Sequence, residues 1–299
     1  MKKQNIIELF SYPLVGLIYV VSWLPLSLLY KLSFIIFFFL YYFPGYRKQV
    51  VYNNLSGAFP DKTNEEILII RRKFYLHISK LFVEVLKLLR YSPAKLNHRC
   101  RFTPEAEKLI NRYLSNNRSV FLVMGHYGNW EWTGTSFFSQ FGVYPISVYK
   151  PVKNRVIDRL LKKIRTRYGV QVYPMKEFPR QMFAVRNKLS AVILIADQTP
   201  SKSNAHWVNF LNRETPVFKG TARLSKMFNY PLILCFSRPV KPGYYDIYAK
   251  LITEKPKDYD EETISLLHSQ MLEKEIINAP QYWLWTHKRW KHKRVKQDF

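Results

Sequence analysis

Short apolar runs that alternate with amphipathic helical patterns constrain the fold of this chain more than any other feature. Residues 120–124, 146–149, 191–195 and 232–236 are such runs, and we interpret each of them as a strand. Strands joined by helices form crossover units, in which neighbouring strands run parallel. The sequence therefore predicts an α/β fold with a mainly parallel sheet covered by helices.

Helix signals fill the stretches between and around these runs. Thr63 and Glu66 have the spacing of a capping box, and apolar residues recur at helical spacing from Ile67 to Leu88. This pattern predicts a long amphipathic helix. Further expected elements are a helix opening at 103–105, a helix at 156–168, a partly exposed strand at 244–251 and a closing helix at 261–277.

The amino-terminal region is apolar over two uncharged stretches, 9–30 and 32–46, separated by Lys31. It is too long for a secretory signal and lacks a cleavage site after it, so we expect it to remain as a hydrophobic, membrane-anchoring helical segment. The alternative is a buried hairpin of the core. We divide the chain into this segment, 1–45, and a catalytic domain, 46–299.

The net charge of the chain limits the kinds of partner that we expect it to bind. The 47 Lys and Arg residues exceed the 21 Asp and Glu residues, so the net charge is +26, and most of the excess lies beyond the apolar segment. Such a chain attracts nucleic acid, anionic lipid headgroups, phosphorylated glycolipids or an acidic carrier protein. The 16% aromatic content and the apolar segment favour membrane lipids over nucleic acid. Basic residues after the segment place the rest of the chain on the cytoplasmic side.

The sequence lacks the motifs of several common kinds of catalytic and metal site. Cys100 and Cys235 are far apart and have no ligand spacing, so we expect neither a disulfide framework nor a metal site. No nucleophile elbow or phosphate loop is present. We therefore expect no cofactor, and we expect an acyl donor that arrives already activated, as a thioester would.

A histidine follows the first apolar run. The run 120–124 leads into a glycine-flanked turn that contains His126, and Glu131 follows after four intervening residues. At this spacing the two side chains meet only across a tight turn, for which Gly125 and Gly128 supply backbone freedom. A carboxylate on one ring nitrogen would let the other nitrogen take a proton, so we predict His126 as general base and Glu131 as its partner.

Spacing alone does not separate this pair from chance. His268 and Glu273 have the same spacing, but both fall within the predicted helix at 261–277, where the side chains would point apart. A buried structural histidine is the alternative for His126. The end of a strand in a parallel sheet, where ligands bind, favours catalysis instead.

Other polar residues stand near predicted strand ends. Asp197 and Gln198 follow the run 191–195, which would deliver them near His126 unless they form a plain turn. Arg165 and Arg167 are candidates for phosphate or oxyanion contacts, and because they are two apart in a helical stretch, at most one should enter the site. A solvated basic face is the alternative for both.

At these residues the sequence resembles the late acyltransferases of lipid A biosynthesis, of the lauroyl and myristoyl type, which belong to the glycerolipid acyltransferase fold. The resemblance covers most of the chain. Its strongest blocks are 125–131, 149–151 with Asp158, Arg165 and Arg167, 196–198 and 281–291; weaker ones are 53–55, 59–60, Glu84 and 210–221.

The resemblance implies an enzyme on the cytoplasmic face of a bacterial inner membrane. It would move a fatty acyl group from acyl carrier protein to a hydroxyacyl chain of an anionic glycolipid, the lipid A precursor, with His126 and Glu131 as the catalytic pair. The alternative acceptor is another glycolipid, an aminolipid or a lysophospholipid. Residues expected to bind substrate are Asn129, Lys150, Arg165, Arg167, Asp197 and Gln198. The chain departs from the family where arginine often replaces Lys150.

Two further patterns allow more than one interpretation. From 282 to 294, tryptophans alternate with Lys and Arg, which suits a membrane interface or, alternatively, core tryptophans beside a solvated charge run. His77 and Glu84 lie seven apart on one face of the predicted long helix, where we expect a packed, hydrogen-bonded pair.

Overall fold

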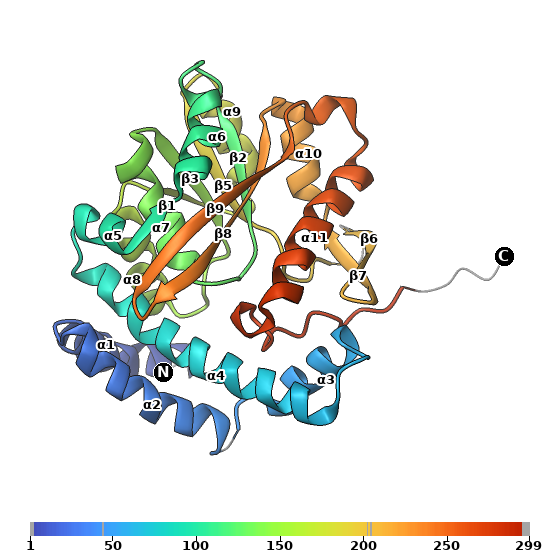
Figure 1. The fold of residues 1–299 in the computed structure, drawn as a ribbon. Coiled ribbons are helices and arrows are strands. Elements are labelled where there is room, and N and C mark those ends of the chain that lie inside the picture. Colours follow the sequence, from blue (N-terminus) through green and yellow to red (C-terminus); the bar gives the residue numbers. More distant parts are fainter. Residues whose placement is uncertain (1–2, 44, 202, 204, 295–299) are drawn as a thin grey trace.

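The computed structural model describes residues 3–43, 45–201, 203 and 205–294. Helices and strands alternate along most of this length (Figure 1). The elements are α1 (Lys3–Val21), α2 (Leu26–Tyr41), α3 (Lys48–Ala58), α4 (Asn64–Leu86), the short 3-10 helix η1 (Lys87–Leu89), α5 (Pro93–Arg99), β1 (Cys100–Phe102), α6 (Pro104–Leu114), β2 (Val120–Met124), α7 (Trp130–Phe141), β3 (Tyr144–Tyr149), α8 (Arg155–Thr166), β4 (Gln171–Pro174), α9 (Phe178–Val185), β5 (Ser190–Ile195), β6 (Ala205–Phe210), β7 (Arg213–Phe218), α10 (Lys219–Phe228), β8 (Leu232–Lys241), β9 (Tyr244–Thr253), the 3-10 turn η3 (Pro256–Asp258), α11 (Glu261–Asn278) and the 3-10 turn η4 (Pro280–Tyr282).

The sheet is mixed but mainly parallel, as the sequence predicts. Its seven strands lie in the order β1-β9-β8-β2-β5-β3-β4, and among them only β8 and β9 pair antiparallel. The central strand β2 has the predicted bounds, 120–124. A separate antiparallel pair, β6 with β7, stands outside this sheet and was not predicted, nor were the short edge strands β1 and β4.

Helices cover both faces of the sheet. Every residue of β2 is buried, and alternate side chains enter different cores because successive residues of a strand point to opposite faces. Phe121 and Val123 pack with residues of α3, α4, α9, α10 and α11. Val120, Leu122 and Met124 pack with residues of α5, α6, α7 and α8. This double cover explains why the central strands are uniformly apolar.

The capping box predicted for the long helix is present in α4. The Thr63 hydroxyl accepts from the backbone N–H of Glu66, and the Glu66 carboxylate accepts from the backbone N–H of Thr63. Helix α4 then runs beneath the sheet and beside α2 (Figure 1). It therefore connects the amino-terminal hairpin with the rest of the fold.

The apolar amino-terminal segment forms a helical hairpin of α1 and α2. Pro13 lies within α1, and Pro25 stands immediately before α2. In the described part of the chain, no helix combines the length and the apolar character needed to cross a membrane. The expected helical segment is thus present, while the structure contains no spanning helix within the described residues.

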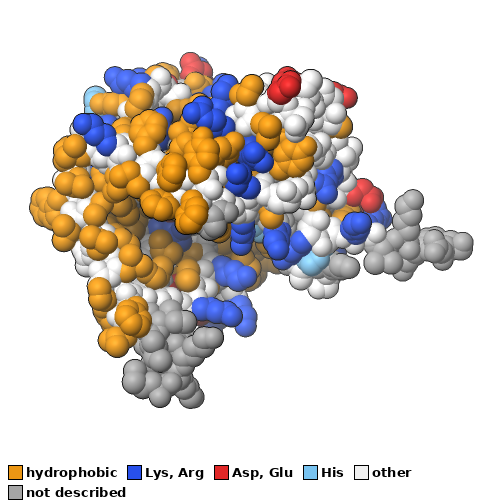
Figure 2. All heavy atoms as spheres, turned by 90° about the horizontal axis from the view of Figure 1, so that it is seen from below, with side chains coloured by type: hydrophobic (Ala, Val, Ile, Leu, Met, Phe, Trp, Pro, Cys, Tyr) orange, Lys and Arg blue, Asp and Glu red, His pale blue; other side chains and the backbone are white. Residues whose placement is uncertain are grey.

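The hairpin exposes a large apolar surface. Trp23 is 71% exposed and Phe10 is 72% exposed, far above what a packed hairpin would leave in contact with solvent. Figure 2 shows hydrophobic side chains gathered over this face of the molecule, with basic side chains next to them. The exposed large apolar residues of the hairpin and its loop are Leu9, Phe10, Tyr12, Leu14, Leu17, Val20, Trp23, Leu24, Leu28, Phe34, Ile35, Phe38, Phe39, Tyr42 and Phe43.

Candidate active site

The turn after β2 depends on two glycines for different reasons. Gly128 has a positive φ of 63°, and an added Cβ would lie 2.1 Å from the backbone oxygen of Ser237. Gly125 needs space instead: a Cβ there would lie 2.9 Å from the side chain of Leu272 and 3.2 Å from Asp197 Oδ2. A larger residue at Gly128 would displace the turn, and one at Gly125 would push against the side chains of Leu272 and Asp197.

Asp197 holds the imidazole of His126. The Nδ1 atom of His126 lies 2.6 Å from Asp197 Oδ1, and the backbone N–H of His126 donates to Asp197 Oδ2 at 2.7 Å. The prediction that the Glu131 carboxylate bonds to the imidazole of His126 is therefore wrong. The register of the strands explains why Asp197 takes the place expected for Glu131. Met124 of β2 pairs with Ile195 of β5, and His126 and Asp197 each lie two residues beyond the end of their strand.

Hydrogen bonding fixes the tautomer of the ring. An ionised carboxylate only accepts, so Nδ1 of His126 carries the proton that bonds to Asp197, and Nε2 carries a lone pair. Gln198 Nε2 lies 3.2 Å from His126 Nε2 and can donate to it. The imidazole is 17% exposed, and because Nδ1 is bonded to Asp197, Nε2 is the ring nitrogen that can accept a proton.

His126 and Asp197 each stabilise the charged form of the other. Burial alone would lower the pKa of His126, but the Asp197 carboxylate and, more weakly, Glu131 raise it above its ordinary value. Burial would raise the pKa of Asp197, yet the His126 ring and backbone and the Trp283 indole hold it well below its ordinary value. Asp197 therefore remains an anion that stabilises a protonated His126.

Glu131 pairs with Arg165. Its two carboxylate oxygens accept from Nη2 of Arg165 at 2.7 Å and from Nε at 3.2 Å, which makes a bidentate ion pair. Glu131 stands in the first turn of α7, and Arg165 comes from the last turn of α8. Burial lowers the pKa of Arg165, and the Glu131 charge more than compensates and raises it.

The remaining residues expected to bind substrate divide into exposed and buried ones. Lys150, after β3, and Arg167, after α8, are exposed, so only Arg165 of the two arginines reaches Glu131. Asn129 is fully buried, and its Oδ1 accepts from the backbone N–H of Trp132 as the cap of α7. A direct contact between the Asn129 side chain and a substrate, as the sequence predicted, does not fit with its burial.

The carboxyl-terminal segment holds the turn from outside. The backbone N–H of Leu284 donates to the His126 carbonyl at 3.0 Å, and the N–H of Gly128 donates to the Tyr282 carbonyl at 3.0 Å. Trp283 Nε1 donates to Asp197 Oδ2 at 2.8 Å. Sequence reasoning missed this role of Trp283, because a strand-like bridge between residues 127 and 283 has no local signal.

The tryptophans of this segment face inward. Trp283 is 3% exposed and Trp285 is fully buried, so the interpretation as core tryptophans is the correct one for them, and the membrane-interface interpretation is wrong. The side-chain amide of Asn54 donates to the carbonyls of Trp285 and His287, each at 2.9 Å. Helix α3 thereby anchors the segment that holds the turn.

His77 and Glu84 do not pair with each other, which corrects the sequence expectation. His77 Nε2 lies 3.2 Å from the Gly128 carbonyl, and the Glu84 carboxylate accepts from Asn129 Nδ2 at 2.8 Å. Both residues therefore contact the turn from α4. Burial lowers the pKa of His77 to about 4, so its ring is neutral at pH 7.

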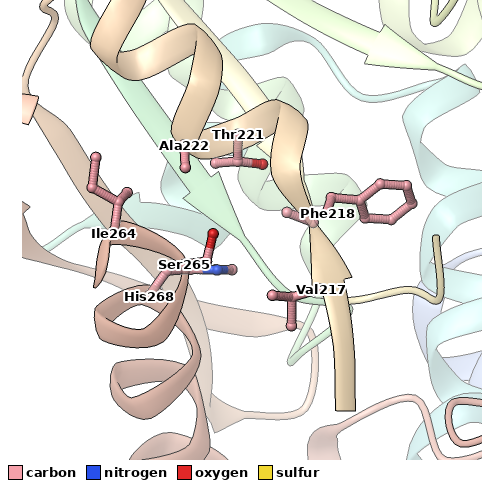
Figure 3. Close-up of a pocket in the computed structure, with 8 residues that line it drawn as sticks. Val217, Phe218, Thr221, Ala222, Ile264, Ser265 and His268 are labelled. Carbon is pink, nitrogen blue, oxygen red and sulfur yellow. The ribbon is translucent and has the colours of Figure 1, made fainter. Parts of the chain in front are cut away.

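The other histidine with an acid at the same spacing, His268, lies on α11. His268 lines a small pocket between β7, α10 and α11 (Figure 3). Ala196, the residue before Asp197, also lines this pocket. Burial lowers the pKa of His268 to about 4, and its Nε2 has no hydrogen-bond partner among the described residues. Glu273 instead accepts from the backbone N–H of Leu211, so the expectation of a coincidental spacing fits.

An imidazole held by a buried carboxylate at the carboxyl edge of a parallel sheet defines an enzyme site suited to general base catalysis. The cysteines offer no competing nucleophile, because both are buried and burial raises the pKa of each thiol. Comparison with family models identifies the family. The model described as bacterial lipid A biosynthesis acyltransferase matches residues 4–292, and the chain therefore belongs to this family and is an acyltransferase.

Curated relatives agree with this membership at low identity. The chain is similar to the lipid A biosynthesis lauroyltransferase of Escherichia coli K12, with 26% identity over 287 residues that cover 93% of the chain and 90% of the relative. It is also similar to the lipid A biosynthesis palmitoleoyltransferase of the same organism and to a lipid A biosynthesis acyltransferase of Shigella flexneri. Each of these two is 23% identical over 257 residues, covering 84% of the chain and 81% of the relative.

Proposed function

We propose that this acyltransferase moves a fatty acyl group from an acyl carrier protein thioester to a hydroxyl on a hydroxyacyl chain of a lipid A precursor. The observation that carries the proposal is the contact between His126 and Asp197, which leaves Nε2 of the ring as a base. The acceptor hydroxyl takes the place of the Gln198 amide at Nε2 and gives its proton to Nε2 as its oxygen attacks the thioester carbonyl. The tetrahedral intermediate then breaks its C–S bond, which leaves the new ester, and the departing thiolate of the carrier takes the proton from the imidazolium.

Asp197 takes the orienting role first predicted for Glu131, and Glu131 keeps an electrostatic one. Its negative charge raises the pKa of His126 and so favours the imidazolium that forms during attack. Glu131 also fixes the guanidinium of Arg165 through Nε and Nη2, which leaves Nη1 outside that pair. We assign this remaining nitrogen to the oxyanion of the tetrahedral intermediate.

Membrane lipid is the proposed setting of the reaction. The outward faces of α1 and α2 are apolar, and cations lie against aromatic rings of the hairpin. Arg90 is 4.1 Å from the ring centre of Trp23 in the turn, and Lys163 is 5.4 Å from that of Tyr19 in α1. Apolar rings beside cations suit the boundary between acyl chains and anionic headgroups. We propose that residues 1–45 anchor the catalytic domain, 46–299, on the cytoplasmic face of the inner membrane.

The two substrates fit the charge of the protein. An acyl carrier protein and a phosphorylated glycolipid are both acidic, and the chain has a net charge of +26. Arg159, Lys162 and Arg167 are exposed on or beside α8, the helix whose Arg165 reaches Glu131. Acidic substrates would therefore meet positive charge close to the site.

A direct assay tests the proposal. Purified protein is incubated with acyl carrier thioester and a phosphorylated, hydroxyacylated glucosamine disaccharide, with lysophospholipid and aminolipid as competing acceptors. We expect acylation of the disaccharide and a rate about 10²–10⁴-fold lower for His126→Ala. His98→Ala, which removes an exposed imidazole on α5, is the matched control and should keep the wild-type rate. A loss below tenfold for His126→Ala contradicts the assignment of the base, and acylation of another lipid alone contradicts the acceptor.

A further inference from the structure

Glu84 joins three parts of the molecule through one buried carboxylate. Its Oε1 accepts from the hydroxyl of Tyr30 in α2 at 2.7 Å. Its Oε2 accepts from Asn129 Nδ2 at 2.8 Å and from the hydroxyl of Tyr245 in β9 at 2.7 Å. Glu84 is only 1% exposed, so no solvent replaces a donor that is lost.

The contact with Asn129 decides which way that amide faces. With Nδ2 held by Glu84, Oδ1 of Asn129 is left to accept from the backbone N–H of Trp132 at 3.0 Å. This bond caps α7, and Glu131 stands between the two residues that it joins. Without Glu84 the amide is free to rotate, and the first turn of α7 loses its fixed cap. The position of Glu131 and its ion pair with Arg165 would then vary.

The contact with Tyr30 leads in the opposite direction, to the apolar hairpin. Tyr30 lies on the side of α2 that faces α4, while Phe34 and Phe38 on the same helix are exposed. A chain of hydrogen bonds thus runs from α2 through Glu84 and Asn129 to the start of α7. It connects the surface assigned to lipid with the turn that carries His126.

Simple packing does not explain a carboxylate at this position. Burial raises the pKa of Glu84, which means that the ionised form is penalised, and an apolar residue would fill the space without that penalty. All three donors are side chains from other elements, so the group serves to fix their positions relative to one another.

We propose that Glu84 is a positioning residue of the acyl-transfer site, and that the hydrogen bond between Glu84 and Asn129 depends, through Tyr30, on the binding of the α1–α2 hairpin to lipid. This inference rests on the proposed function. Glu84 touches neither substrate; it acts through Asn129 on the turn between β2 and α7. The hairpin would then act as more than an anchor, because its contact with lipid would order the site.

Kinetics test the first half of the proposal. In Glu84→Leu all three acceptor bonds are lost, whereas Glu84→Gln keeps one acceptor oxygen and the shape of the side chain. We expect kcat to fall about 10²-fold in Glu84→Leu, as for a misplaced catalytic group, and by less in Glu84→Gln, with KM for both substrates within about threefold of wild type. Unchanged kcat in folded Glu84→Leu, or a change confined to KM, overturns the proposal.

Hydrogen exchange tests the second half and needs no acyl transfer. Amide exchange of the segment 130–135 is measured with and without vesicles of phosphatidylethanolamine and phosphatidylglycerol. In the wild type we expect vesicles to slow this exchange several-fold, because a seated hairpin fixes Tyr30. Tyr30→Phe should abolish the slowing. Tyr245→Phe also removes a hydroxyl that donates to Glu84, but this hydroxyl comes from β9 and not from the hairpin. In Tyr245→Phe we therefore expect vesicles still to slow the exchange.

The outcomes separate this inference from the function on which it rests. If the wild type transfers no acyl group but its segment 130–135 responds to vesicles only when Tyr30 is intact, the coupling stands and the function fails. If both tyrosine variants respond like the wild type, or if vesicles have no effect on the wild type, the coupling is overturned. Should Glu84→Leu not fold, the two conservative tyrosine variants still decide the question.

Discussion

Two regions rich in aromatic residues lie toward opposite ends of the chain, and they fold in opposite ways. In the amino-terminal hairpin most of the aromatic side chains face outward, and Trp23 is 71% exposed. In the carboxyl-terminal segment Trp283 and Trp285 face inward and are at most 3% exposed. Composition alone therefore does not tell an exposed apolar surface from a buried support of the candidate site.

Hydrogen bonding accounts for the difference. The carboxyl-terminal segment runs beside the turn after β2, where the His126 carbonyl and the Gly128 N–H find partners in its backbone. Its indole N–H groups also find buried acceptors, Asp197 for Trp283 and the Pro280 carbonyl for Trp285. The hairpin pairs most of its backbone within its own helices, and the carbonyls of Ser22 and Leu24 in its turn accept from Lys87, so its rings are free to face outward.

The prediction with the largest effect concerns the carboxylate that Trp283 contacts. Asp197→Asn keeps the shape of the side chain but removes the charge that orients and stabilises the His126 imidazole. We expect the rate of acyl transfer to fall by about 10²–10⁴-fold with the fold intact. Asp246→Asn, which removes a carboxylate paired with the exposed Arg101, serves as the control and should change the rate far less.

Truncating one tryptophan from each region would sharpen the contrast in stability. Trp285→Ala opens a cavity in the core, and we expect the free energy of unfolding to fall by about 3–5 kcal/mol. Trp23→Ala removes an exposed ring and its contact with Arg90, and should cost about 1 kcal/mol or less. Denaturant titration of both variants measures the difference; equal losses would remove the contrast.

Charge on the hairpin tests the lipid surface. Phe39 in α2 and Ile277 in α11 are exposed to a similar extent, at 54% and 53%. Phe39→Asp should weaken binding to vesicles of phosphatidylglycerol and phosphatidylethanolamine by about tenfold or more, because the ring no longer enters the lipid. Ile277→Asp should leave binding unchanged. Vesicle flotation measures both, and equal effects would show that the apolar face of the hairpin is not the contact.

The smallest expected effect comes from a single hydrogen bond. Trp283→Phe removes the N–H that Asp197 Oδ2 accepts while keeping an aromatic ring in the core. A hydrogen bond to a charged group contributes about 1.5 kcal/mol, so we expect the rate of acyl transfer to fall about tenfold. Tyr282→Phe removes a hydroxyl nearby and controls for general disturbance of the segment. A wild-type rate in Trp283→Phe would limit this segment to a packing role.

The sequence predicts the central elements well because their signals are local. The apolar run of β2 and the capping box of α4 each lie within a few residues, and both are confirmed at the predicted positions. The hairpin of β6 and β7 was missed because its strands carry polar residues and lack the apolar runs used to find the others.

The site was predicted in part for the same reason. His126 and Asp197 were both identified, and their closeness was expected from neighbouring strand ends. The partner of the ring was assigned to Glu131 because the two are close in sequence, whereas the register of β2 with β5 brings Asp197 to it. Contacts such as those of Trp283 depend on how distant segments pack, and spacing within one segment carries no information about them.

The pH dependence of catalysis tests the central claim, that Asp197 makes His126 a base, most directly. A general base must be unprotonated, so kcat/KM should rise with pH and level off above the pKa of His126, which Asp197 raises above the ordinary value of about 6.5. In Asp197→Asn the inflection should move to lower pH, because burial then lowers the pKa without an anion to oppose it. An inflection at the same pH in both proteins would contradict the account.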